Sequence, residues 1–148
     1  MDDTWFEIPE LAAQVRERVP GAFVKATYSS GPSHLEQTGS PASIWIGIFN
    51  SSLNDGPLAA METMAVELAP LGLAWLAAHD LSRAETTVMI AFGDGSEGPV
   101  MSWSNLLETV RFVIGKDKAL TRILSGLSAA DEEFFREMRY RGSGRDMP

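Results

Sequence analysis

The chain contains two histidines, and each lies close to a carboxylate in the sequence: His34 precedes Glu36 by two residues, and His79 directly precedes Asp80. An imidazole beside a carboxylate can act as a general acid or base. A His-Asp pair also occurs among the metal ligands of phosphohydrolases, which need further His and Asp ligands. The chain has no Gly-x-Ser-x-Gly nucleophile motif. We therefore keep a small hydrolase that uses His34, Glu36 and His79 only as a second alternative.

A glycine pattern, Gly93-x-Gly95-x-x-Gly98, matches the dinucleotide-binding fingerprint in spacing. That fingerprint requires a helix whose N-terminus faces the phosphates, whereas the next residues, Pro-Val-Met-Ser-Trp, favour extended chain. Asp94 and Glu97 also place two carboxylates where a phosphate would bind. The kinase version of the pattern requires HRD and DFG motifs, which the sequence lacks. The pattern therefore predicts a turn between two strands, and we expect no cofactor.

The charge of the chain indicates which partners it can bind. The net charge is −8, and residues 1–100 alone carry thirteen acidic against four basic side chains. A surface of this sign repels phosphate backbones and attracts basic proteins, so we expect a protein partner and no nucleic acid. The chain has no cysteine, which excludes thiolate metal sites, and we expect no metal. It shows no signal peptide and no apolar run of about 20 residues, so we expect a cytoplasmic protein without a membrane partner.

The elements that must position these side chains follow from hydrophobic spacing. Ile44, Ile46 and Ile48 alternate with Trp45, Gly47 and Phe49, which indicates a central strand covered on both faces. The segment 71–80 fits either a buried strand or a helix, and we favour the strand. The predicted elements are a helix over 9–19, strands over 22–28, 43–49, 71–80 and 86–92, a short strand over 99–103, a loop over 29–41, a turn over 50–57, a helix from 58 to about 70–72, and three helices within 105–141.

This order predicts an α+β domain with one mixed or mostly antiparallel sheet of about 4–5 strands, covered by helices, and with a helical C-terminal third. A chain of 148 residues fits a single globular domain. We assign that domain to residues 1–141 and a flexible C-terminal tail to residues 142–148.

No set of residues in the sequence assembles a convincing active site, so we expect a binding protein and not an enzyme. A small, acidic, cysteine-free chain is typical of a stoichiometric inhibitor, such as an immunity protein or antitoxin that neutralises a basic partner. Charge complementarity would speed association, and aromatic side chains would supply affinity. The candidate partner-binding carboxylates, chosen by charge and expected exposure, are Asp55, Glu62, Glu67, Asp94 and Glu97.

A structural assembly protein, such as a small phage or secretion-system component, is the first alternative. Strands that are apolar on both faces could pair with those of a neighbouring copy, and homo-oligomerisation stays open. Trp5 and Phe6 precede the first predicted helix, and we expect them to pack onto the fold in preference to serving as an exposed anchor.

Overall fold

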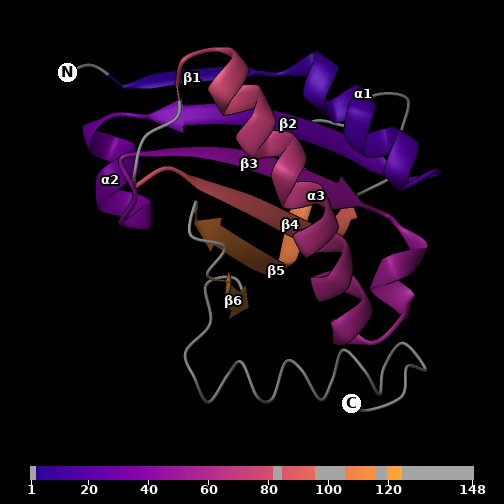
Figure 1. The fold of residues 1–148 in the computed structure, drawn as a ribbon. Coiled ribbons are helices and arrows are strands. Elements are labelled where there is room, and N and C mark those ends of the chain that lie inside the picture. The colour runs from indigo at the N-terminus through magenta and orange to yellow at the C-terminus, as the bar shows by residue number, and fades with distance from the viewer. Residues whose placement is uncertain (1–2, 82–84, 96–105, 116–119, 125–148) are drawn as a thin grey trace.

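The computed structural model describes residues 3–81, 85–95, 106–115 and 120–124, and Figure 1 shows their arrangement. A single mixed sheet contains six strands in the order β1-β2-β3-β4-β5-β6, with β3 and β4 parallel and every other pair antiparallel. The strands are β1 (Thr4–Glu7), β2 (Phe23–Ser30), β3 (Ala42–Phe49), β4 (Thr87–Gly95), β5 (Leu106–Gly115) and β6 (Leu120–Leu124). The expected α+β class and mixed sheet are confirmed.

Within the described residues, three α-helices and one short 3-10 helix connect these strands. They are α1 (Pro9–Arg18), α2 (Pro32–Thr38), η1 (Ser52–Asp55) and α3 (Leu58–Ala78). Helices α1 and α3 lie against the same face of the sheet and contact each other (Figure 1). Helix α3 also makes the crossover between β3 and β4, which is why these two strands are parallel.

The core lies between the sheet and these two helices. Ile44, Ile46 and Ile48 of β3 are fully buried, as the alternation of this strand predicts. Helix α3 lies close to the sheet at Gly72, where an added Cβ would be 3.1 Å from both Cγ atoms of Val88 and 3.5 Å from Ile44 Cγ2. This contact places the isoleucines of β3 on the helix side of the sheet. The alternate residues of the strand therefore occupy the opposite face.

Residues 71–78 belong to α3, and residues 79–80 form a turn, so the predicted strand over 71–80 is wrong. The buried residues of α3 continue at helical spacing through and beyond Pro70, and they are Leu58, Met61, Ala65, Leu68, Ala69, Gly72 and Leu76. Pro70 itself is exposed, so its ring faces solvent and the buried side of the helix is not interrupted. Burial of this long apolar stripe outweighs the loss of one helical hydrogen bond at the proline.

Helix α3 also has the length and composition of a membrane span, with 21 residues and a mean hydropathy of 1.2 over its most apolar window. The sequence analysis did not identify so long an apolar element. Its buried residues pack against the sheet, as they do in the core helix of a globular domain.

Two of the predicted C-terminal helices are also wrong, because Leu106–Gly115 and Leu120–Leu124 form β5 and β6. Val110, Phe112 and Ile114 are buried while Arg111 and Val113 are partly exposed, and that period of two is the signature of a strand. The predicted short strand over 99–103, the third predicted helix and the predicted tail lie outside the described residues. The antiparallel partner of β4 is β5.

Helix α2 and strand β1 form where the sequence predicts a loop and no element, respectively. Helix α2 lies within the expected loop over 29–41, where Pro32 starts the helix and Gly39, in the left-handed conformation, ends it. Strand β1 contains Trp5 and Phe6 and pairs with β2. Phe6 is 37% exposed and packs against the ring of Tyr28, whereas Trp5 is 56% exposed, so Phe6 meets the expectation of packing onto the fold more closely than Trp5 does.

Candidate functional site

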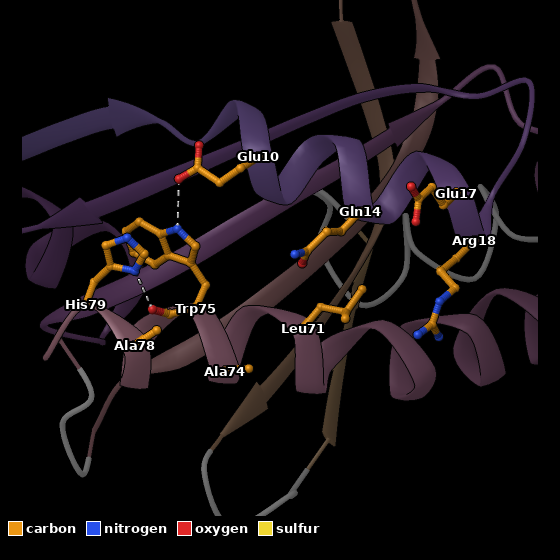
Figure 2. Close-up of a pocket in the computed structure, with 9 residues that line it drawn as sticks. All are labelled: Glu10, Gln14, Glu17, Arg18, Leu71, Ala74, Trp75, Ala78 and His79. Carbon is orange, nitrogen blue, oxygen red and sulfur yellow. Dashed lines mark hydrogen bonds between the residues drawn. The ribbon is translucent and has the colours of Figure 1, made fainter.

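A groove of about 550 Å³ lies between α1 and α3 on the outer side of the helix layer. Helix α1 contributes a polar wall, because its positions i, i+4 and i+7 are Glu10, Gln14 and Glu17. Helix α3 contributes Leu71, Ala74, Trp75, Ala78 and its C-capping residue His79. Figure 2 shows Glu10 beside Trp75 and His79 at one end of the groove, Gln14 in the middle, and Glu17 with Arg18 at the other end.

Three side chains form the aromatic end of this groove. The indole Nε1 of Trp75 donates a hydrogen bond of 3.1 Å to Glu10 Oε1, which ties α3 to the first turn of α1. The ring of His79 stacks on that indole with centroids 4.0 Å apart and an interplanar angle of 19°. The imidazole Nδ1 of His79 lies 2.9 Å from the carbonyl oxygen of Trp75, which fixes the orientation of the ring (Figure 2).

The rings behind Trp75 anchor it to the sheet. Its ring lies 5.9 Å from the ring of Phe6 and 6.3 Å from that of Tyr28, and Phe6 and Tyr28 stack at 5.2 Å. An indole held between a histidine and two aromatic rings has little freedom to rotate. The Glu10 carboxylate therefore lies in a fixed position at the mouth of the groove.

The environment of Glu10 favours its ionised form. Hydrogen bonds from its own backbone N–H and from the Trp75 indole, together with the nearby imidazole of His79, lower the pKa of this carboxyl below its ordinary value of 4.5. Glu10 also lies in the first turn of α1, where the helix dipole stabilises a negative charge. The groove thus holds a permanent anion at its aromatic end near neutral pH.

His34 lies on the other face of the sheet, in a chain of hydroxyl groups. Its Nε2 is 2.9 Å from Ser43 Oγ, Ser43 Oγ is 2.7 Å from Thr87 Oγ1, and Thr87 Oγ1 is 3.4 Å from Ser40 Oγ. Ser40 Oγ donates at 2.8 Å to the carbonyl oxygen of Ala42. Burial, and to a smaller extent the charge of Arg111, lowers the pKa of His34 below 6.5. The imidazole is therefore neutral near pH 7.

The direction of donation along this chain determines which nitrogen of His34 carries the proton. A carbonyl oxygen only accepts, so Ser40 donates to a backbone carbonyl and accepts from Thr87. Thr87 has one hydroxyl proton, which makes it the acceptor from Ser43, and Ser43 in turn accepts from His34. This order of bonds, which starts from the 3.4 Å contact between Thr87 and Ser40, assigns the proton of His34 to Nε2. Such a histidine donates to Ser43 and cannot act as the base that activates this serine as a nucleophile.

A second hollow, of about 460 Å³, lies beside this hydroxyl chain, between the end of α2 and strands β4 and β5. Thr38, Ser40, Glu85, Thr87 and Arg111 contribute to its lining. The hydroxyl groups of Ser40 and Thr87 bond to each other and to their neighbours. We interpret this polar cluster as a structural link between α2 and the sheet.

The structure does not bring the two histidines together. His34 bonds to Ser43, whose neighbour Ile44 faces α3, so His34 lies on the face opposite the helices. His79 stacks on Trp75 on the helix face. Glu36 is exposed on α2 two residues from His34, and side chains two residues apart on a helix do not face each other. The predicted grouping of His34, Glu36 and His79 is therefore not formed.

The five candidate carboxylates come from different elements. Asp55 belongs to η1, Glu62 and Glu67 to α3, and Asp94 to the end of β4, while Glu97 lies outside the described residues. Glu67 and Asp94 are exposed, as expected, whereas Glu62 is only partly exposed. Within the described part of the chain, no group of three or more His, Cys, Asp or Glu side chains has the geometry of a metal site.

The glycine pattern begins inside β4, where Gly93 and Gly95 pair with Glu108 and Leu106 of β5. The two strands are antiparallel, and the register shifts by one residue after Phe92. A dinucleotide fingerprint would instead lead from a strand into a helix. Its last glycine, Gly98, lies outside the described residues.

The groove was not predicted from the sequence. Glu10 and Trp75 are 65 residues apart, and no local pattern indicates that their side chains meet. One signal was available: the polar positions Glu10, Gln14 and Glu17 repeat at helical spacing beside the buried stripe of α1. Recognising the opposite wall required the correct assignment of residues 71–78 as helix.

No family model matches this chain, and no curated protein matches it. Among solved structures, the chain is similar to one described as "Crystal structure of Sex pheromone staph-cAM373 precursor". The match has 10% sequence identity and a TM-score of 0.35, and it covers 84% of this chain and 42% of the other. The chain thus spans less than half the length of that structure.

Proposed function

We propose that this chain is a non-catalytic acidic binding protein that captures a basic protein partner, in the manner of a stoichiometric inhibitor. The observation that carries the proposal is the groove between α1 and α3, where a fixed carboxylate and ordered aromatic rings lie at an accessible surface. Carboxylates steer a basic partner into contact, and aromatic rings provide rigid contact area at a low cost in conformational entropy.

The charge distribution supports the same proposal. The excess of acidic side chains falls in residues 1–100, which contain both helices of the groove. The candidate carboxylates Glu62, Glu67 and Asp94 extend the acidic character of the surface beyond the groove. In this proposal, Glu10 and Glu17 anchor the partner, while the more distant carboxylates mainly accelerate its approach.

The chemistry around His34 argues against the hydrolase alternative. The proton on His34 Nε2 points to Ser43, and the other histidine lies on the opposite face of the sheet. An assembly protein is the stronger alternative, because β1 forms one edge of the sheet and all four of its residues are exposed. An edge strand of this kind can accept a strand from a second copy.

The test compares the full chain with a double variant, Glu10→Gln/Glu17→Gln. Glutamine keeps an oxygen that accepts the Trp75 hydrogen bond, so the groove retains its shape while it loses two charges. A basic protein retained by the immobilised chain from an extract of its source is purified, and its Kd is measured by calorimetry. We expect the variant to bind about fivefold more weakly, since two exposed ion pairs together contribute roughly 1 kcal/mol.

The matched control is Glu36→Gln/Glu85→Gln, which removes the same charge from exposed positions outside the groove. The control should retain the affinity of the unmodified chain at about 0.15 M salt. If both double variants bind the partner equally more weakly, the affinity depends on net charge alone. A retained partner that is acidic would contradict the proposal.

A further inference from the structure

The two walls of the groove differ in chemistry in a way that restricts what can occupy it. The wall from α1 carries the polar side chains Glu10, Gln14 and Glu17, whereas Leu71, Ala74 and Ala78 make the wall from α3 apolar. The alanines are one helical turn apart and leave the space above them open. A volume of about 550 Å³ accommodates long side chains but not a whole helix, which is about 10 Å wide.

The spacing of the two carboxylates sets the size of the ligand. Glu10 and Glu17 are seven residues apart on α1, which corresponds to about 10 Å along the helix axis. Figure 2 shows them at opposite ends of the groove. A segment in the polyproline II conformation has three residues per turn and rises about 3.1 Å per residue, so its residues i and i+3 lie on the same face and about 9 Å apart.

We propose that the groove takes two basic side chains of one partner segment in the polyproline II conformation, spaced as residues i and i+3, with one cation at Glu10 and the other at Glu17. The aliphatic stems of these side chains lie along Leu71 and Ala74, as arginine and lysine stems commonly do on apolar surfaces. The first cation also contacts the outer face of His79, whose inner face stacks on Trp75. This inference rests on the proposed function and specifies the chemistry that the site recognises.

Arg18 gives the inference a distinctive consequence. Its guanidinium lies at the Glu17 end of the groove and repels a second cation that enters there (Figure 2). Arg18→Gln should therefore strengthen the binding of a doubly basic segment. A site for anions would lose affinity in the same variant.

The experiment titrates the full chain with defined peptides and follows the indole N–H signal of Trp75 by NMR. This signal is identified by its absence from the spectrum of Trp75→Phe, and it reports on the bond to Glu10. The main probe is acetyl-Arg-Ala-Ala-Arg-amide. The spacing control, acetyl-Arg-Arg-Ala-Ala-amide, has the same charge, and acetyl-Glu-Ala-Ala-Glu-amide tests for an anion site.

We expect the main probe to bind about threefold more tightly than the spacing control, because only the former reaches both carboxylates. Glu10→Gln and Glu17→Gln should each weaken it about threefold, Arg18→Gln should tighten it about twofold, and Glu36→Gln should leave it unchanged. Equal affinity for both arginine peptides, or weaker binding after Arg18→Gln, would overturn the inference.

Two further outcomes distinguish this inference from a polyamine site and from the proposed function alone. Spermidine carries protonated amines at a similar separation, and tenfold tighter binding of spermidine than of the main probe would indicate a polyamine site and overturn the proposed docking of a partner segment. If no peptide shifts the Trp75 signal while partner capture still depends on Glu10 and Glu17, the i, i+3 inference fails and the proposed function stands. If capture does not depend on these residues either, both fail.

Discussion

At the scale of single residues, Ser43 holds the hydrogen-bond chain together. Its side chain is buried, accepts a hydrogen bond from His34 and donates one to Thr87. Through these bonds it links α2 to β3 and β4 on the face of the sheet opposite α1 and α3.

Replacing Ser43 by alanine should lower the free energy of unfolding by about 1–2 kcal/mol, because His34 Nε2–H and Thr87 Oγ1 each lose a partner. Urea unfolding followed by circular dichroism measures the change. The control is Ser29→Ala, since Ser29 pairs with Ser43 in the β2-β3 register and lies on the same face. An equal loss of unfolding free energy in both variants would show that the hydroxyl chain does not stabilise the fold.

The lowered pKa of His34 predicts a dependence of stability on pH. The unfolded chain titrates at the ordinary value of 6.5 and the folded chain below it, so the unfolded state binds more protons between these two values. The contribution of His34 to the free energy of unfolding is therefore fully present above pH 6.5 and decreases as the pH falls. We expect His34→Gln to flatten this part of the stability profile between about pH 7.5 and pH 5.5. An unchanged slope in the variant would contradict the assignment.

At the scale of elements, β3 shows how a glycine shapes a sheet face. Trp45 and Phe49 lie over Gly47 with their ring centroids 5.9 Å apart. A Cβ at position 47 would come within 2.3 Å of Trp45 Cη2 and 2.5 Å of Phe49 Cε2. A larger residue at position 47 would force both rings to move from these positions.

Gly47→Ala should destabilise the protein by about 1–3 kcal/mol, because both rings must leave their positions. Gly56→Ala is the matched control: its φ is −98°, and an added Cβ would meet its nearest neighbour at 3.5 Å, an ordinary contact. Thermal unfolding of both variants tests the expectation. A Gly47→Ala protein as stable as the control would show that the rings adjust without cost.

The elements also show where sequence patterns are sufficient. Strand β3 and helix α1 were predicted within one or two residues, because alternation and helical spacing are unambiguous there. The sequence predicts a helix at β5, although the alternation of Val110, Phe112 and Ile114 indicates a strand. Pairing with β4 decides that these residues form a strand, and no local pattern in the sequence indicates that pairing.

At the scale of the whole molecule, the two proposed roles predict different oligomeric states: the negative charge suits an inhibitor, and the exposed edge strand suits an assembly protein. An inhibitor that binds a partner one to one can be monomeric, whereas assembly through β1 would produce defined multimers. Size-exclusion chromatography with light scattering distinguishes these alternatives. We expect a monomer at micromolar concentration, and a stable ring or multimer would favour the assembly alternative.

The distribution of charge also predicts how binding depends on salt. Replacing Asp55, Glu62, Glu67, Asp94 and Glu97 together by alanine should reduce the association rate and its sensitivity to ionic strength, while the dissociation rate changes little. Stopped-flow measurements from about 0.05 to about 0.3 M salt test this expectation. Unchanged rates would restrict the binding surface to the groove.

The sequence by itself determined the α+β class, the central strand, the first helix and the acidic character, because each of these depends on composition or on the spacing of neighbouring residues. Only the tertiary structure decided that α3 continues through Pro70, that residues 106–115 and 120–124 are strands, and that Glu10 meets Trp75. Each of these depends on burial against segments far away in the chain, and the spacing of neighbouring residues does not specify which distant segments meet. The groove is a product of that packing, since its two walls are adjacent in space but 65 residues apart in sequence at the Glu10–Trp75 bond.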